Sequence, residues 1–228
     1  MRPQAVMLFA AGFGTRMGAL TAERPKPLIE VAGRPLIDHA LDFVDAFGAE
    51  TVVANLHYKS DMLRAHLAGR AIGFSEEQPD ILETGGGLRA ALPMLGQGPV
   101  MTMNTDAVWN GPNPLSLLAE AWDPDRMDAL LICIPRAQAV GHAGQGDFIA
   151  DDQGRLTRGP GAIYGGVQIV KTEGLSDIED EAFSLNLLWN RMLDENRLFG
   201  LTYPGQWCDV GRPEGIELAE RMVGFSDV

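Results

Sequence analysis

The sequence predicts an α/β fold, in which a mostly parallel, mixed sheet carries helices on both faces. Short apolar segments alternate with segments of helical periodicity over about the first 135 residues, and this alternation is typical of a parallel sheet covered on both sides. The first apolar segment, Ala5–Phe9, contains no polar residue, as expected of a strand buried on both faces. A glycine-rich stretch then interrupts the alternation, which indicates a small antiparallel flap.

The elements of the first half are placed by apolar spacing and by residues that begin or end helices. Residues 36–47 have helical spacing of apolar side chains; Pro35 suits a first helical turn and Gly48 suits a helix end. The other predicted elements are, in order, strand 51–55, helix 59–68, strand 71–74, helix 87–95 broken by Pro93, and strand 99–103, which ends at Asn104-Thr105-Asp106.

The second half begins in the same way and then changes. Residues 140–166 carry eight glycines, with short strands expected near Phe148 and Leu156, and we expect them to form the flap. No repeat, low-complexity tract or linker divides the sequence, so residues 1–228 are predicted to form a single domain. The remaining predicted elements are helix 113–121, strand 129–134, strand 167–170, helix 184–195, strand 198–203 and helix 213–223.

Charge and composition exclude several classes of function. The net charge of −13 argues against a nucleic-acid-binding surface, although residues 1–34 hold five basic side chains against two acidic ones. No apolar stretch of about 18 residues is present and the N-terminus carries no leader, so we expect a cytoplasmic protein without membrane contact. The two cysteines, Cys133 and Cys208, form neither a disulfide framework nor a metal-ligand pattern.

The segment Phe9-Ala10-Ala11-Gly12-Phe13-Gly14-Thr15-Arg16 directly follows the first strand and reads as a phosphate-binding loop. Gly12 and Gly14 let backbone N–H groups approach an anion closely, while Arg16 and Lys26 add fixed positive charge. The loop is neither Gly-x-Gly-x-x-Gly, because Met17 stands at the third glycine, nor Gly-Lys-Ser/Thr. A Gly-x-Gly alone is as often a tight turn, so the loop needs support from elsewhere in the chain.

Two aspartates supply that support. Asp106 follows the predicted strand 99–103, and Asp209 follows Trp207-Cys208 near the end of the chain. Ligands of open parallel sheets bind at the carboxyl ends of the strands, and two carboxylates there could hold Mg²⁺, which prefers oxygen ligands. The alternative is that each aspartate only caps a helix or a turn.

Other features narrow the chemistry further. Glycine-rich turns at 82–87, 144–147 and 164–166 are candidate ligand contacts, or flexible loops. The four histidines lie in unrelated contexts, and neither a Gly-x-Ser-x-Gly motif nor a cysteine–histidine pair is suggested. A reaction that needs only positioning, metal and positive charge fits better, and transfer at phosphorus is such a reaction. An attacking phosphate is already ionised at neutral pH, so it needs no general base.

Several motifs spread over nearly the whole chain carry a family resemblance. Together they are similar to the signature of the sugar-1-phosphate nucleotidyltransferases. The motifs are Ala10-Ala11-Gly12-Phe13-Gly14-Thr15-Arg16, Leu20-Thr21, Pro25-Lys26-Pro27-Leu28, Val31-Ala32-Gly33-Arg34-Pro35-Leu36-Ile37, Glu83-Thr84-Gly85-Gly86-Gly87, Asn104-Thr105-Asp106, Gly146-Asp147-Phe148 and Trp207-Cys208-Asp209-Val210-Gly211.

The resemblance implies a Rossmann-like sheet, a sugar-side flap and a Mg²⁺-dependent reaction. A nucleoside triphosphate and a sugar 1-phosphate would give a nucleotide sugar and pyrophosphate. The substrates that it favours are UTP and N-acetylmuramate 1-phosphate. It further implies a nucleotide-binding part at about 1–110 and a sugar-binding part at about 111–228, in a monomer or a homodimer.

The resemblance also implies roles for individual residues. Arg16 would bind the β- and γ-phosphates, Lys26 would contact the α-phosphate and the sugar phosphate, and Asp106 and Asp209 would ligate Mg²⁺. The other members of the expected site are Ala11, Gly12, Gly14, Thr15, Glu77 and Gly85 for the nucleotide, and Glu83, Asp147, Gly165 and Gly166 for the sugar.

The chain departs from the family pattern at two positions and leaves rivals open. Ala19 stands where the family usually has proline, and Thr105 stands where it has glycine between the asparagine and the aspartate. A β-branched residue at 105 implies a different backbone geometry beside a metal ligand. The rival functions are a mannose- or glucose-1-phosphate transferase using GTP or another nucleotide, a phosphocholine cytidylyltransferase, and a catalytically silent regulator that binds a nucleotide sugar.

Overall fold

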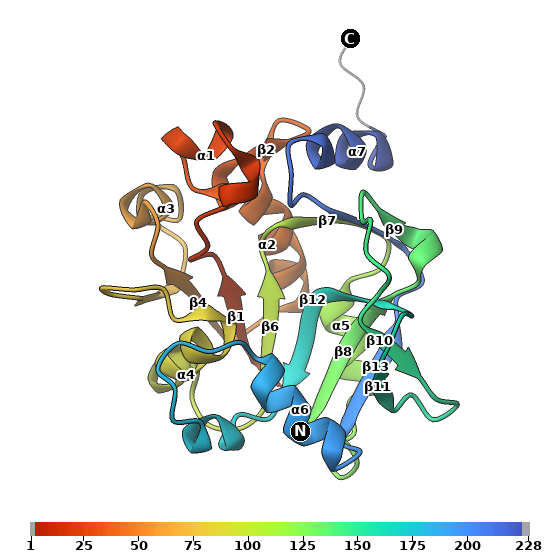
Figure 1. The fold of residues 1–228 in the computed structure, drawn as a ribbon. Coiled ribbons are helices and arrows are strands. Elements are labelled where there is room, and N and C mark those ends of the chain that lie inside the picture. Colours follow the sequence, from red (N-terminus) through yellow and green to blue (C-terminus); the bar gives the residue numbers. More distant parts are fainter. Residues whose placement is uncertain (1–2, 225–228) are drawn as a thin grey trace.

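The computed structural model describes residues 3–224 and has a seven-stranded sheet at its centre (Figure 1). The strand order is β13-β8-β12-β6-β1-β4-β5. All neighbours are parallel except β12, which is antiparallel to both β6 and β8. The mostly parallel, mixed sheet is therefore confirmed. Its strands are β1 (Ala5–Phe9), β4 (Thr51–Leu56), β5 (Gly73–Glu76), β6 (Val100–Asn104), β8 (Ala129–Ile134), β12 (Ile163–Val170) and β13 (Leu198–Thr202).

Helices cover both faces of this sheet, as predicted. Successive side chains of a strand point to opposite faces: Val6 and Leu8 pack with α2, α3 and α5, while Ala5 and Met7 pack with α4 and α6. In Figure 1, α4 and α6 lie in front of the sheet and α2 and α5 behind it. The helices are α1 (Leu20–Glu23), α2 (Leu36–Phe47), α3 (Ser60–His66), α4 (Glu83–Leu95), α5 (Pro114–Ala121), α6 (Asn186–Asp194) and α7 (Glu214–Met222).

The predicted helix 87–95 is longer than expected, because α4 begins at Glu83 and Pro93 does not break it. Pro93 lies in the last turn, so only the end of the helix lies beyond the backbone hydrogen bond that its missing N–H cannot make. Gly85 and Gly86 are part of the first turns, and their N–H groups donate to the carbonyl oxygen of Phe183. A Cβ atom at either glycine would collide with the 181–183 segment, so these glycines serve close packing rather than a loop.

Several strands were misplaced or missed by the sequence analysis. Strand β5 starts at Gly73 rather than at 71, and β12 starts at Ile163 rather than at 167, which places Gly165 and Gly166 inside a strand. Two further small sheets are present that the sequence did not predict. They consist of β7 (Ala107–Asn110), β14 (Gln206–Asp209) and β9 (Ala139–Val140), and of β2 (Glu30–Val31) and β3 (Arg34–Pro35).

The three-stranded sheet joins distant parts of the chain above the main sheet. Met17, Val108, Cys208 and Val210 are buried in one small core together with residues of α7, so α7 packs beside the segment that follows the glycine loop. The predicted flap is present as an antiparallel hairpin of β10 (Phe148–Ala150) and β11 (Leu156–Arg158). Within residues 3–224, no helix is long and apolar enough to cross a membrane.

Candidate active site

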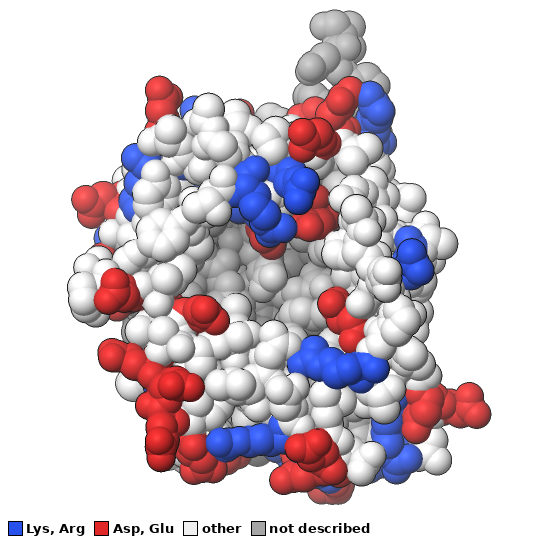
Figure 2. Space-filling model, in the orientation of Figure 1, with Lys and Arg blue, Asp and Glu red and all other residues white. Residues whose placement is uncertain are grey.

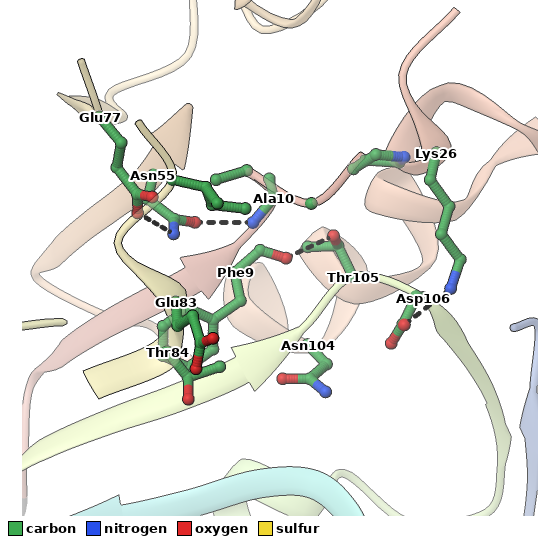
Figure 3. A pocket seen from close by; sticks show the side chains of 14 residues that line it. Phe9, Ala10, Lys26, Asn55, Glu77, Glu83, Thr84, Asn104, Thr105 and Asp106 are labelled. Carbon is green, nitrogen blue, oxygen red and sulfur yellow. Dashed lines mark hydrogen bonds and ion pairs between the residues drawn. The ribbon is translucent and has the colours of Figure 1, made fainter. Parts of the chain in front are cut away.

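A cleft lies at the carboxyl ends of β1, β4 and β6, where the predicted loops meet. Figure 2 shows a hollow in this face, with basic side chains at its upper rim and acidic side chains around it. Figure 3 shows the side chains that line the cleft. These residues are Phe9, Ala10, Ala11, Gly12, Lys26, Pro27, Asn55, Glu77, Ile81, Glu83, Thr84, Asn104, Thr105 and Asp106.

The glycine loop is folded tightly against the segment that carries Lys26. Gly14 has φ of 63°, and a Cβ atom there would lie 2.8 Å from both Lys26 Cβ and Thr21 Cγ2. The Thr21 hydroxyl donates to the carbonyl oxygens of Gly14 and Gly18, at 3.1 Å each. Only glycine fits at position 14, whereas Gly12 faces open space. The loop thus leaves Gly12 accessible at the cleft and holds Lys26 beneath Gly14.

Lys26 and Asp106 form an ion pair across the cleft. Lys26 Nζ lies 2.8 Å from Asp106 Oδ2, and the lysine side chain is only 9% exposed. Lys26 begins the short 3₁₀ turn Lys26–Leu28 between two prolines, whose fixed φ angles limit the freedom of the turn. A buried ammonium is thereby held beside a carboxylate at the end of β6.

Thr105 ties the Asp106 loop to the end of the first strand. Its side chain is buried, and its hydroxyl donates to the Phe9 carbonyl oxygen at 2.8 Å (Figure 3). The residue that replaces the family's glycine therefore forms a specific link between β1 and the loop after β6. The sequence predicts a changed backbone geometry at Thr105, but it does not predict this hydrogen bond.

A buried network supports the opposite wall of the cleft. The Asn55 amide accepts from the Ala10 N–H at 2.7 Å and donates to Glu77 Oε1 at 2.6 Å. Glu77 Oε2 accepts from the Leu82 N–H at 2.7 Å. Glu77 is fully buried, and both of its carboxylate oxygens are bonded within the protein. Asn55 was not singled out in the sequence, because an asparagine at a strand end is not distinctive.

Contrary to expectation, Asp209 does not follow a strand of the main sheet but ends β14 of the three-stranded sheet. It reaches the same region because β14 pairs with β7, which directly follows Asp106. The Val210 N–H donates to the Asp106 carbonyl oxygen at 3.0 Å, which joins the two aspartate loops. Burial and the nearby charge of Asp106 raise the pKa of the Asp209 carboxyl, against the opposing charges of Lys26, Arg16 and His142. A carboxyl whose ionisation is made costlier by burial and by a neighbouring carboxylate suits a divalent cation.

A second cavity adjoins Asp209, which lines it together with Arg16, His142, Arg212 and Glu214, among others. Arg16 and Arg212 also line a third cavity together. Neither guanidinium forms a hydrogen bond or an ion pair with any residue in the described range 3–224. Two unneutralised arginines beside a carboxylate pair favour a polyanion that arrives with a metal. Arg212 was missed in the sequence, where it is only one residue of the turn before the last helix.

Of the residues predicted to face the sugar, Glu83 begins α4, Asp147 directly precedes β10 of the flap, and Gly165 and Gly166 lie on β12. Asp147 Oδ2 accepts from the Tyr164 N–H at 2.9 Å. Gly166 has φ of 86°, and a Cβ atom there would lie 2.9 Å from the Asn104 side chain, which lines the central cleft. Gly165 is packed against Trp109 and Ile134 in the same way. These glycines let β12 lie directly beside the cleft.

The predicted site residues are therefore not all in one cavity. The central cleft brings together Ala11, Gly12, Lys26, Glu77, Glu83 and Asp106, and the second cavity contains Arg16 and Asp209. Gly14, Thr15, Gly85, Asp147, Gly165 and Gly166 line neither of these two cavities. The N–H group of Gly85 already donates to Phe183.

The donor set at the cleft fits one class of metal. No cluster of three or more histidine, cysteine, aspartate or glutamate side chains able to hold a metal occurs in the described part of the chain. Asp106 and Asp209 instead offer two carboxylates, and Mg²⁺ commonly takes one or two carboxylates and completes its shell with water and substrate phosphates. The residues present thus fit Mg²⁺ that is shared with a polyphosphate.

The cleft, with its glycine loop, the buried Lys26 and two neighbouring aspartates, is that of a nucleotidyltransferase, as similarity to known proteins shows. The protein-family model of the MobA-like NTP transferase domain matches residues 6–148, and the chain belongs to this family, as a sugar-1-phosphate nucleotidyltransferase. It is 41% identical to the N-acetylmuramate alpha-1-phosphate uridylyltransferase of Caulobacter vibrioides, with 96% of each chain covered.

Two further proteins support the family and the fold. The N-acetylmuramate alpha-1-phosphate uridylyltransferase of Neisseria meningitidis is 30% identical, with 96% of this chain and 97% of the relative covered. The solved structure of the inositol-1-phosphate CTP transferase from T. maritima superimposes with a TM-score of 0.76 at 17% identity, covering 100% of this chain and 99% of that one. The latter likeness shows the fold alone.

Proposed function

We propose that this enzyme transfers the uridylyl group of UTP to N-acetylmuramate 1-phosphate, giving UDP-N-acetylmuramate and pyrophosphate in cell-wall recycling. The observation that carries the reaction type is the proximity of Lys26, Asp106 and Asp209 to one another beside the glycine loop. The choice of substrates is supported by 41% identity, over nearly the whole chain, to a relative with this activity in its name.

The chemistry proceeds by in-line displacement at the α-phosphorus of UTP. A phosphate oxygen of the sugar phosphate forms the new bond, while the bond from the α-phosphorus to the bridging oxygen of the β-phosphate breaks. The attacking phosphate is already ionised at neutral pH, so the site needs no general base. Lys26 neutralises charge that develops at the α-phosphate, and it holds the two reacting phosphates close together.

The two free arginines receive the leaving group. Arg16 and Arg212 flank the cavity that also contains Asp209, and a guanidinium forms strong hydrogen bonds to phosphate oxygens. We assign both to the β- and γ-phosphates of UTP and to the departing pyrophosphate. Asp106 and Asp209 would hold Mg²⁺, which supplies charge neutralisation on the phosphates of the bound nucleotide.

The remaining residues shape the two substrate sites. Ala11 and Gly12 present backbone groups to the nucleotide at the cleft, within a nucleotide-binding part at about 1–110. Glu77 acts through Asn55 and Leu82, whose positions it fixes, rather than by direct contact with the base. Glu83, Asp147, Gly165 and Gly166 form the sugar side, within a sugar-binding part at about 111–228 of a single domain.

A panel of substrates tests the proposal. The purified protein is mixed with Mg²⁺, each of the four common nucleoside triphosphates and each of several sugar 1-phosphates, and release of pyrophosphate is measured. The expected result is fastest release with UTP and N-acetylmuramate 1-phosphate. Preference for GTP with mannose 1-phosphate would replace the substrates but keep the class, whereas preference for CTP with phosphocholine, added as a further acceptor, would keep only the nucleotidyl transfer. Nucleotide binding without release under any condition would indicate a silent regulator instead.

A further inference from the structure

The guanidinium group of Arg158 is held in place by uncharged side chains. It ends β11, where the hairpin meets α6, and its Nη2 donates to Oδ1 of Asn186 at 2.7 Å and of Asn190 at 3.1 Å. Its guanidinium carbon lies 4.7 Å from the ring centroid of Phe148 and 5.9 Å from that of Trp189. These four partners fix the guanidinium without neutralising its charge.

Several other arginines in this half of the chain are paired with carboxylates, whereas Arg158 in the described structure is not. Arg155, Arg191 and Arg197 each lie within ion-pair distance of an aspartate. Arg158 has no carboxylate within that distance among residues 3–224, although the chain holds 31 acidic residues against 18 Lys and Arg. Burial lowers the pKa of Arg158, and the charge of nearby Asp147 opposes this change. A fixed, partly buried and unpaired cation is costly unless an anion binds there.

A series of contacts links Arg158 to the wall of the central cleft. Asp147, which acts on Arg158 through its charge, accepts the Tyr164 N–H on β12. Two residues further along β12, Gly166 packs on Asn104 in the wall of the central cleft. Figure 2 shows basic and acidic side chains at the lower right rim of the hollow, where the hairpin approaches α6. A ligand that extends from the cleft along β12 would therefore reach this cation.

The chemistry of the proposed sugar identifies the anion. N-acetylmuramate differs from N-acetylglucosamine only in a lactyl ether on the C3 oxygen, which ends in a carboxylate. We infer that Arg158 binds this lactyl carboxylate and thereby selects N-acetylmuramate 1-phosphate over N-acetylglucosamine 1-phosphate. The inference rests on the proposed function and assigns the specificity residue of its sugar site. The Nε and Nη1 groups of Arg158 donate to no residue of the described chain, so donors remain for the carboxylate.

The test compares the two sugar phosphates, which share every group except the lactyl ether. Turnover with UTP and Mg²⁺ is measured for wild type, Arg158→Ala and Arg158→Lys; N-acetylglucosamine 1-phosphate is also measured as a competitive inhibitor. Arg158→Ala should lower kcat/KM for N-acetylmuramate 1-phosphate by about 10- to 100-fold, the usual effect of losing a charge-assisted hydrogen bond. Most of the loss should be in KM, and the constants for N-acetylglucosamine 1-phosphate should change less than about twofold. Arg158→Lys should recover part of the loss.

Arg155→Ala serves as the matched control, because Arg155 lies beside β11 but pairs with Asp151; it should leave both sugar phosphates unaffected. Equal losses on both sugars in Arg158→Ala, or no loss on N-acetylmuramate 1-phosphate, would overturn the inference while the proposed function stands. A wild-type enzyme that does not accept N-acetylmuramate 1-phosphate would overturn the proposed function and this inference with it. Circular dichroism and thermal unfolding identify a variant that fails to fold, in which case Arg158→Gln replaces it.

Discussion

The ammonium group of Lys26 lies 2.8 Å from a carboxylate oxygen of Asp106, although 80 residues separate the two in sequence. The pair joins the turn after the glycine loop to the end of β6, and it places the buried cation next to a candidate metal ligand. Lys26→Ala should lower kcat by at least about 100- to 1,000-fold, the effect of removing one preorganised charge in an active site. Lys26→Arg, which keeps the charge but not the shape, should recover little. A folded Lys26→Ala enzyme with near-normal turnover would contradict the role.

The two aspartates should control the metal requirement. Asp106→Asn and Asp209→Asn each remove one carboxylate from a pair that fits Mg²⁺, so each variant should need about tenfold or more Mg²⁺ for half-maximal rate. The measurement is a Mg²⁺ titration of turnover at saturating UTP. Asp151→Asn is the control, since Asp151 lies on the hairpin and caps its own turn. Unchanged Mg²⁺ curves in both active-site variants would remove them as ligands.

The Thr105 hydroxyl should matter through its bond to Phe9. Thr105→Val keeps the shape and removes the donor, which leaves the partly buried Phe9 carbonyl oxygen without this partner. We expect a loss of about 1–2 kcal/mol in the free energy of unfolding and a several-fold drop in kcat, because the Asp106 loop is less firmly placed. Thr105→Ser should behave like wild type. Urea unfolding and turnover assays of both variants distinguish the effect of the hydroxyl group from that of side-chain size. Equal stability and turnover of Thr105→Val and Thr105→Ser would refute the role of the hydrogen bond to Phe9.

Arg212 should bind the leaving group rather than the sugar. Its side chain is exposed and shares two cavities with Arg16. Arg212→Ala should weaken inhibition by inorganic pyrophosphate by about 3- to 10-fold. This is the effect of losing a charge-assisted hydrogen bond that solvent has weakened. Inhibition by the nucleotide-sugar product, which lacks the γ-phosphate, should stay unchanged. Arg221→Ala is the control, because Arg221 lies on α7, which begins two residues after Arg212, and is paired with Glu217; it should alter neither constant. Equal weakening of both inhibitors would place Arg212 elsewhere.

Asp128 should stabilise the opposite end of the sheet in a pH-dependent way. Its carboxylate contacts Lys171 Nζ at 2.8 Å and Arg197 Nε at 2.7 Å. Burial alone would raise its pKa, but the hydrogen bonds from Arg197 and Lys171 outweigh burial, and the pKa lies below its ordinary value of 3.8. The stabilisation is therefore present above pH 3.8 and is lost as the pH falls toward the lower folded-state pKa.

Asp128→Asn removes this stabilisation. Its free energy of unfolding should be lower than that of wild type by about 1–2 kcal/mol at pH 7, and the difference should shrink steadily below pH 4. Urea unfolding of wild type and Asp128→Asn, at pH 7 and at a pH below 4, measures this difference in free energy. A difference that does not depend on pH would show that the charge of Asp128 is not what stabilises the fold. Turnover at pH 7 should be unchanged, because Asp128 lies at the edge of the sheet where β8 begins.

The main sheet and its covering helices were predictable because strand burial and helix periodicity are local properties. Residues 5–9 and 36–47 fold as their apolar patterns indicate. The small sheet of β7, β9 and β14 was not predictable, since its two- to four-residue strands pair segments from across the chain. The early start of α4 was missed for another reason: Gly85 and Gly86 weaken a helix locally, and only their contact with residues 181–183 explains them.

The candidate site was predictable where a residue type is unusual in its place. A lysine between two prolines and aspartates after strands are distinctive, and the structure brings Lys26, Asp106 and Asp209 together. Asn55, Arg212 and Arg158 were missed, because their significance depends on which partners they have or lack in three dimensions. Glu77 shows the reverse case: it lines the cleft as expected, yet both of its oxygens are bonded to the protein.

The most direct measurement of the proposed function is identification of the products by mass spectrometry. The enzyme is incubated with UTP, N-acetylmuramate 1-phosphate and Mg²⁺, and nucleotide sugar and pyrophosphate are quantified together. We expect UDP-N-acetylmuramate and pyrophosphate in equal amounts, with both absent when Mg²⁺ is removed or when Lys26→Ala replaces wild type. Pyrophosphate without a nucleotide sugar, or no product from a protein that still binds UTP, would contradict the assignment as a sugar-1-phosphate uridylyltransferase.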